Sequence, residues 1–266
     1  MTGTADAFAA AKAEGRGALV GYLPAGFPDV DGSIEAMRTK VEAGCDVIEV
    51  GLPYSDPVMD GPTIQAAAQQ ALEAGTRTTD VLRVVEAVAA TGVPTVVMTY
   101  WNPVVRYGVE KFATDLANAG GAGLITPDLV PDEADEWVAA ADAHSLDKIF
   151  LVAPSSTDVR LRSTAEACRG FVYATAVMGV TGARESSSDL AGPLVARTRA
   201  VTDLPVCVGL GVSHGDQAAE VASYADGVIV GSAFVRRLLD AGTDRAAGLA
   251  SLAELTRDLA DGVRRA

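Results

Sequence analysis

The sequence is poor in the residue types that bind metals. It contains two histidines, His144 and His214, and three cysteines, Cys45, Cys168 and Cys207. The cysteines are far apart and have no C-x-x-C spacing, so we expect buried, reduced thiols and neither disulfides nor a metal site. With two histidines, a histidine-based metal centre is equally disfavoured.

Basic residues and long apolar runs are also lacking. Lys and Arg number 21 against 35 Asp and Glu, which argues against nucleic-acid binding because phosphate backbones are held mainly by cations. No apolar run approaches the roughly 18 residues that can span a bilayer. The first residues lack the basic start and apolar block of a secretion signal. We therefore expect a cytoplasmic protein without a membrane or nucleic-acid partner.

The chain does contain eight short β-rich runs, separated by Ala-rich segments with helical apolar spacing, for example at 33–44, 79–92, 109–121 and 131–144. This alternation predicts a parallel sheet. Eight such units fit a (β/α)8 barrel better than a doubly wound sheet, which usually has about five or six strands. We expect residues 1–266 to form a single barrel domain with an N-terminal helix. The runs cover residues 18–23, 46–51, 95–100, 122–128, 148–154, 171–177, 205–211 and 226–232.

A charged residue interrupts the second run, DVIEVG. Side chains alternate along a strand, so Glu49 shares one face with Val47 and Gly51, whereas Ile48 and Val50 share the other. The apolar pair suits the layer between sheet and helices, which places Glu49 inside the barrel near its rim. Burial there predicts a raised pKa and general acid/base catalysis. A structural glutamate, bound to a backbone amide or an arginine, is the alternative.

The loop that follows, LPYSDPVMDGPT, is rich in proline and longer than an ordinary connection in a barrel, which favours a functional role. Asp56 could initiate a turn before Pro57. Asp60 could serve a site or cap the next helix. Asp46, at the opposite end of the strand, is expected to be exposed.

Glycine and small hydroxyl residues follow three later strands, in GVTGAR (179–184), GLGVS (209–213) and GSA (231–233). Barrels often hold a phosphate on backbone N–H groups after the seventh and eighth strands, together with a helix N-terminus. The pattern predicts binding of a phosphate ester, because amide dipoles can hold the anion despite the acidic composition. The polar stretch 179–192 is a candidate lid.

Taken together, these segments resemble the α subunit of tryptophan synthase along nearly the whole chain. The resemblance rests on DVIEVGLPYSDPVMDGPTIQ, MTYWNPV, GVTGAR, GLGVS and VGSA, in the order and spacing of that family. It implies a barrel that cleaves indole-3-glycerol phosphate into indole and glyceraldehyde 3-phosphate, with no cofactor of its own. It also implies a partner, the β subunit, which carries pyridoxal phosphate and receives indole through a channel in an α2β2 complex.

The resemblance also implies roles for single residues. Glu49 takes the general acid/base position, Asp60 pairs with the indole N–H, and Tyr173 is the tyrosine of the sixth strand. Tyr22 and Tyr100 would lie on strands that contribute to the indole pocket. The other substrate-binding positions surround the phosphate and are Thr181, Gly182, Gly211, Gly231 and Ser232.

Three positions depart from the commonest family pattern. Tyr22 stands where phenylalanine is usual, Ala176 where a serine often occurs, and Leu210 where an aromatic residue is common. None of these changes removes a proposed catalytic group. Asp128, at the end of the fourth strand, could take part in the chemistry or brace the barrel mouth.

Several functional alternatives remain at this stage. Val58 and Met59, with the apolar segment 100–108, could form a docking surface for the β subunit or pack locally over the barrel mouth. The barrel could instead be a sugar-phosphate isomerase or epimerase, a catalytically idle activator of a partner enzyme, or a free-standing lyase that releases indole.

Overall fold

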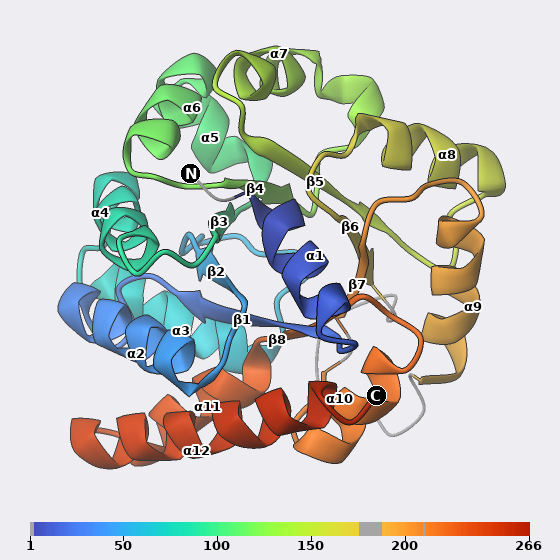
Figure 1. Cartoon of the computed structure of the whole chain (residues 1–266). Helices are drawn as coiled ribbons and strands as arrows, with labels where there is room; N and C mark the ends of the chain where they lie inside the picture. Colours follow the sequence, from blue (N-terminus) through green and yellow to red (C-terminus); the bar gives the residue numbers. More distant parts are fainter. Residues whose placement is uncertain (1–2, 176–187, 210) are drawn as a thin grey trace.

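The computed structural model describes residues 3–175, 188–209 and 211–266, and its eight parallel strands close into a barrel surrounded by helices (Figure 1). Each strand pairs with its neighbours in chain order, and β1 closes the barrel by pairing with β8. The (β/α)8 prediction is therefore confirmed. The strands are β1 (Ala18–Pro24), β2 (Val47–Gly51), β3 (Thr95–Met98), β4 (Gly123–Thr126), β5 (Asp147–Val152), β6 (Val172–Thr175), β7 (Val206–Gly209) and β8 (Gly227–Val230).

Helices cover the outside of the barrel, except α1, which lies across one end of it (Figure 1). The expected helical segments are present as α2, α4, α6 and α7, and a short 3-10 helix, η1, precedes α7. The helices are α1 (Thr4–Ala13), α2 (Val30–Ala43), α3 (Pro62–Glu73), α4 (Thr78–Ala89), α5 (Trp101–Tyr107), α6 (Val109–Asn118), η1 (Pro131–Glu133), α7 (Asp135–Ala143), α8 (Asp158–Ala167), α9 (Ser188–Arg199), α10 (Gly215–Ala222), α11 (Ser232–Ala241) and α12 (Arg245–Val263).

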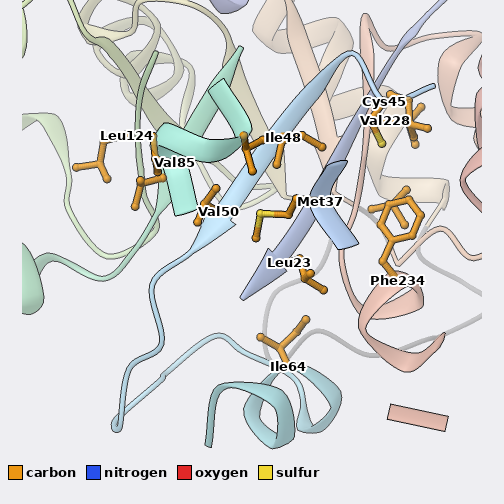
Figure 2. Close-up of a cluster of buried hydrophobic side chains, with 14 of the residues drawn as sticks. Leu23, Met37, Cys45, Ile48, Val50, Ile64, Val85, Leu124, Val228 and Phe234 are labelled. Carbon is orange, nitrogen blue, oxygen red and sulfur yellow. The ribbon is translucent and has the colours of Figure 1, made fainter. Parts of the chain in front are cut away.

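The outer layer of the core lies between the barrel wall and the helices. Ile48 and Val50 of β2 point into it, as predicted, and meet Met37 of α2 (Figure 2). Phe234 of α11 lies in the same layer. Burial of these large apolar side chains is the main force that holds the helices on the sheet.

The inner layer fills the barrel itself. Val47, Val96 and Ile149 point inward from three strands and are fully buried. At the amino-terminal end α1 covers this layer, with the ring of Phe8 centred 5.2 Å from that of Phe171. The amino-terminal end is thus packed, and a ligand must enter at the carboxyl-terminal end, where barrel enzymes carry their sites.

Asp46 is not exposed, so this prediction is wrong. Its carboxylate accepts hydrogen bonds from Arg16 Nη1 at 2.8 Å, from Arg16 Nη2 at 2.9 Å and from the Leu19 backbone N–H at 2.8 Å. The ion pair covers the amino end of β2, because Arg16 follows α1 and is brought over it by the tertiary fold.

Strand β3 ends at Met98, two residues before the predicted end at Tyr100. The aromatic run misled the prediction, because the chain turns at Tyr100 into α5. The first N–H of that helix, from Trp101, is bound by Asp128 at 2.9 Å. By contrast, Gly44, which precedes the second β-rich run, acts as the helix end that glycine is typical of: it ends α2 with a φ of 118°.

The cysteines are free thiols, as predicted; Cys45 and Cys207 are buried, whereas Cys168 is partly exposed. Within the described ranges, no helix is long and apolar enough to cross a membrane. No group of three or more His, Cys, Asp or Glu side chains that could hold a metal occurs in that part of the chain.

Candidate active site

A cavity opens at the carboxyl-terminal end of the barrel. It brings together most of the predicted site residues, which come from β1, β2, β6, the loop before α3 and the loops after β7 and β8. Its lining consists of Tyr22, Glu49, Met59, Asp60, Ile64, Met98, Leu151, Tyr173, Thr175, Gly209, Gly211, Ile229, Gly231 and Ser232.

Glu49 lines this cavity and is completely buried. Neither of its carboxylate oxygens has a hydrogen-bond partner among the described residues. Burial raises its pKa to about 8, and the positive charge of Lys40 opposes this rise. A structural glutamate would be tied to an amide or an arginine, and no such partner is found in the described part of the chain.

Two tyrosines flank Glu49. Tyr22 of β1 stands opposite Glu49 in the register of the β1–β2 pair, and Tyr173 lies on β6. Side chains at Gly51 and Gly209 would collide with the hydroxyls of Tyr22 and Tyr173, respectively, so these glycines make room for the two rings. Burial raises the pKa of both tyrosines well above the ordinary value, which keeps their hydroxyls neutral.

Asp60 reaches the cavity from the loop after β2. Helix α3 begins with Gly61, and not Asp60, as its N-cap, and Pro62 lies in its first turn. Partial burial raises the pKa of Asp60, while a hydrogen bond with the Tyr100 side chain opposes the rise. The surroundings of the Asp60 carboxyl group are thus more polar than those of Glu49.

The predicted position of Tyr100 on a strand is wrong. Tyr100 lies after β3, is the N-cap of α5, and does not line the cavity. Its hydroxyl accepts a hydrogen bond from the Met59 N–H at 2.9 Å and is also bonded to Asp60. Tyr100 therefore holds the loop that carries Asp60 in place through these two hydrogen bonds.

The opposite end of the cavity is formed by backbone. Gly211 has a φ of 74°, and Gly231 is the N-cap of α11, whose first residue is Ser232. The N–H groups at a helix N-terminus are unpaired within the helix and favour an anion. The predicted positions Thr181 and Gly182, with Ala176, Leu210 and most of the candidate lid, lie outside the described residues.

Comparison with known proteins agrees with this geometry. The tryptophan synthase alpha chain family matches residues 8–264. The chain belongs to this family. It is 66% identical to the tryptophan synthase alpha chain of Salinispora tropica over 258 residues, which cover 97% of this chain and 96% of the relative. A structure of Mycobacterium tuberculosis tryptophan synthase superposes with a TM-score of 0.92 at 58% identity and covers 98% of both chains.

Distant members of the tryptophan synthase alpha chain family keep the same fold. The subunit alpha of Legionella pneumophila strain Paris superposes with a TM-score of 0.89 at 30% identity, over 99% of both chains. Membership makes this chain a carbon–carbon lyase of tryptophan biosynthesis, as the resemblance implied. The family assignment argues against a sugar-phosphate isomerase or epimerase. The presence of both Glu49 and Asp60 in the cavity argues against a catalytically idle barrel.

Sequence reasoning missed several residues of the cavity wall. Met98, Leu151 and Ile229 point inward into the cavity. They lie two positions along their strands from Val96, Ile149 and Gly227, which also face inward, so alternation could have found them. Met59 comes from the loop after β2 and Ile64 from α3. The alternation that distinguishes inward from outward side chains on a strand does not apply to these two segments.

Asp128 braces the mouth of the barrel. Both of its carboxylate oxygens accept from the Trp101 N–H, at 2.9 and 3.2 Å, so it caps the N-terminus of α5. Asp128 is not among the cavity residues. Of the two roles left open by the sequence, the geometry favours support for α5 over chemistry.

The loops after β2 and β3 also pack against each other on the outside of the mouth. The rings of Tyr54 and Tyr100 are centred 5.3 Å apart, and Asn102 Nδ2 donates to the Tyr54 hydroxyl at 3.1 Å. Val58 and Val105 remain 70% and 51% exposed. Val58 lies on the loop after β2 and Val105 on α5, and their exposure favours a docking surface over local packing for these two valines.

Proposed function

We propose that this chain, acting as one barrel domain, cleaves indole-3-glycerol phosphate into indole and glyceraldehyde 3-phosphate by general acid/base catalysis. Glu49 and Asp60 are the proposed catalytic carboxylates, assisted by Tyr173. One observation carries the proposal: the carboxylate of Glu49 is buried, has no hydrogen-bond partner among the described residues, and lies in the cavity that Asp60 also lines.

The reaction needs two groups of this kind. Direct cleavage of the carbon–carbon bond would leave an unstabilised indole carbanion, so the ring must first be protonated at its attachment carbon. Asp60 stabilises the positive charge that develops on the ring N–H. Glu49 moves protons at the reacting carbon and at the glycerol hydroxyl.

The surroundings of Glu49 and Asp60 suit this division of roles between the two carboxylates. Burial brings the pKa of Glu49 to about 8, so both of its protonation states are accessible near neutral pH. The hydrogen bond from Tyr100 favours the ionised form of Asp60, which is the form that pairs with a cationic ring. Tyr173, a neutral hydroxyl close to Glu49, can donate to the glycerol part of the substrate.

The phosphate is proposed to lie at the N-terminus of α11. Gly231, Ser232 and Gly211 would bind it through backbone N–H groups, and Thr181 and Gly182 of the 179–184 segment are proposed to add to this site. Tyr22 would contact the indole end. No cofactor of this chain takes part in the proposed mechanism.

The partner is proposed to be a tryptophan synthase β subunit, which carries pyridoxal phosphate and receives the indole within an α2β2 complex in the cytoplasm. Two exposed apolar residues support this position for the partner: Val58, which adjoins the cavity residue Met59, and Val105 of α5. Indole leaving the barrel mouth would then enter the β subunit directly.

An assay of indole release with and without the β subunit tests the proposal. We expect the wild-type chain to form indole and the β subunit to accelerate it. Glu49→Gln should lower kcat on the order of 10²- to 10⁴-fold, because proton transfer is lost. Glu254→Gln, the same change at an exposed glutamate of α12 that does not line the cavity, is the control and should have little effect.

Each result has a distinct meaning. Near-normal cleavage by Glu49→Gln would remove the catalytic assignment. Cleavage that the β subunit does not change would make the chain a free-standing lyase and would contradict the proposed coupling.

A further inference from the structure

A buried ammonium group lies just outside the active-site cavity. Lys40 of α2 has no exposed surface, and its Nζ donates to the Gly21 carbonyl oxygen at 3.1 Å. The same Nζ lies 5.1 Å from the centre of the Phe234 ring. No carboxylate lies within ion-pair distance of it among the described residues. Burial of an unpaired charge is unfavourable, so its presence requires a reason.

Lys40 and Glu49 lie on opposite faces of the barrel wall formed by β1 and β2. Gly21 lies in β1 next to Tyr22, and Tyr22 stands opposite Glu49 in the pair of strands. Gly21 faces outward, and a Cβ on it would lie 3.4 Å from the Lys40 Nζ and 2.8 Å from Cys45 Sγ. The absent side chain thus admits the ammonium against the outer face of β1, while Glu49 lies on the inner face of the adjoining strand.

Packing alone does not account for a lysine here. The neighbouring Met37 fills the same layer between α2 and the barrel with an apolar chain of similar length, and Cys45 and Phe234 complete it (Figure 2). A methionine at position 40 could fill the space without the desolvation penalty of a charge. The feature that lysine adds is the charge itself.

We propose that Lys40 is a positioning residue of the lyase site: its positive charge, held behind the barrel wall, favours the ionised form of Glu49, which accepts the proton of the substrate. The inference rests on the proposed role of Glu49. It makes the α2 helix, which contributes no residue to the cavity, a determinant of the pH range of the reaction.

Among residues 3–175, 188–209 and 211–266, the other titratable groups around Glu49 do not supply a positive charge. Tyr22, Tyr173 and Cys207 face it from β1, β6 and β7, and burial raises the pKa of each, so they are neutral. Asp60 shares the cavity, and its negative charge acts in the opposite direction to that of Lys40. Within the described part of the chain, the positive charge of Lys40 is what lowers the pKa of Glu49.

The surroundings of Lys40 are consistent with this assignment. Burial lowers its pKa to about 8, which leaves it charged at neutral pH, and Glu49 is one of the two groups that oppose this change. The other, Cys45, has its pKa raised by burial to about 12 and is neutral. Asp46, beyond it, is paired with Arg16. The remaining charged residues of α2 and α11 are exposed: Asp31, Glu35, Arg38, Glu42, Arg236, Arg237 and Asp240.

The pH profile of kcat/KM tests the proposal with Lys40→Met, which removes the charge and keeps the apolar chain. We expect the acid limb to move upward by roughly one pH unit, with kcat/KM about tenfold lower on that limb and recovered at higher pH. The matched control is Lys148→Met. Lys148 is also buried, but it pairs with Asp142 at 2.6 Å and does not line the cavity, so its profile should be unchanged.

A titration measures Glu49 without turnover. Glutamate labelled with ¹³C at the carboxyl carbon reports ionisation, and the signal of Glu49 is the one absent from Glu49→Gln. We expect its midpoint to rise in Lys40→Met and to stay in place in Lys148→Met. An unshifted midpoint in folded Lys40→Met overturns the proposal, as does a lower kcat/KM at every pH with an unshifted profile. A wild-type chain that forms no indole would refute the lyase function instead, and the titration would still decide on Lys40.

Discussion

The two ends of the cavity handle charge in opposite ways. At the β2 end, negative charge is carried by the side chains of Glu49 and Asp60, and burial raises the pKa of both. At the β7–β8 end, a positive potential comes from the backbone at Gly231 and Ser232, where α11 begins. The first end therefore depends on protonation, whereas the second does not titrate.

This difference separates chemistry from binding. A group that transfers protons must have a pKa near the working pH, so its side chain and its burial both matter. A group that holds a phosphate needs a fixed geometry and no proton, and amides supply it in an acidic chain. Changes at the two ends should accordingly affect kcat and KM differently.

A carboxylate placed at the amide end should raise KM strongly, because it would repel the phosphate of the substrate. Ser232→Asp would bring a negative charge close to the bound phosphate, and we expect KM for indole-3-glycerol phosphate to rise about 10- to 100-fold with a smaller change in kcat. An acidic residue at a helix N-terminus does not disfavour folding. Ser232→Ala is the control, and steady-state kinetics are the measurement; an unchanged KM would mean that the phosphate lies elsewhere.

The carboxylate end can be examined through stability. The pKa of Glu49 is about 8 in the folded protein and 4.5 ordinarily, so the folded state binds its proton more tightly than the unfolded chain. The resulting stabilisation is present below pH 4.5 and is lost as the pH rises through 8, at about 1.4 kcal/mol for each pH unit.

Glu49→Gln should therefore gain unfolding free energy relative to the wild type as the pH rises from 5 to about 8. Urea denaturation at several pH values measures this difference. Glu254→Gln, a change of an exposed glutamate, is the control. A difference that stays constant with pH would show that Glu49 has an ordinary pKa.

The smallest effect is expected at Asp128, a carboxylate at the mouth that binds backbone and not substrate. Asp128→Ala removes the cap of α5 and should lower the unfolding free energy by about 1 kcal/mol, with kcat retained. Asp128→Asn keeps an acceptor and should lose less. A large decrease in kcat for Asp128→Asn would instead make Asp128 a third catalytic carboxylate.

The fold was largely predictable because its signals are local. Alternating runs indicated the eight strands, and Gly44 marked a helix end correctly. Errors arose where a long-range contact overrode the local pattern. Tyr100 leaves the strand because Asp128, from the loop after β4, binds the next N–H of the chain. Asp46 is covered because Arg16 folds over it.

The site was predictable where strand alternation or a glycine pattern applied. Glu49 follows from its parity with Val47, and the helix that begins at Ser232 follows from the glycines before it. Met59, Ile64 and Lys40 could not be found in this way, since a residue on a loop or a helix gives no sign of which strand it will face.

The sequence by itself determined the alternation of strands and helices, the inward direction of Glu49 and the family, because each depends on residue order alone. Only the tertiary structure decided that Glu49 has no hydrogen-bond partner among the described residues, that Tyr100 supports Asp60, and that Lys40 lies behind Gly21. These properties depend on burial and on distances between elements far apart in the chain, and both arise only when the barrel closes.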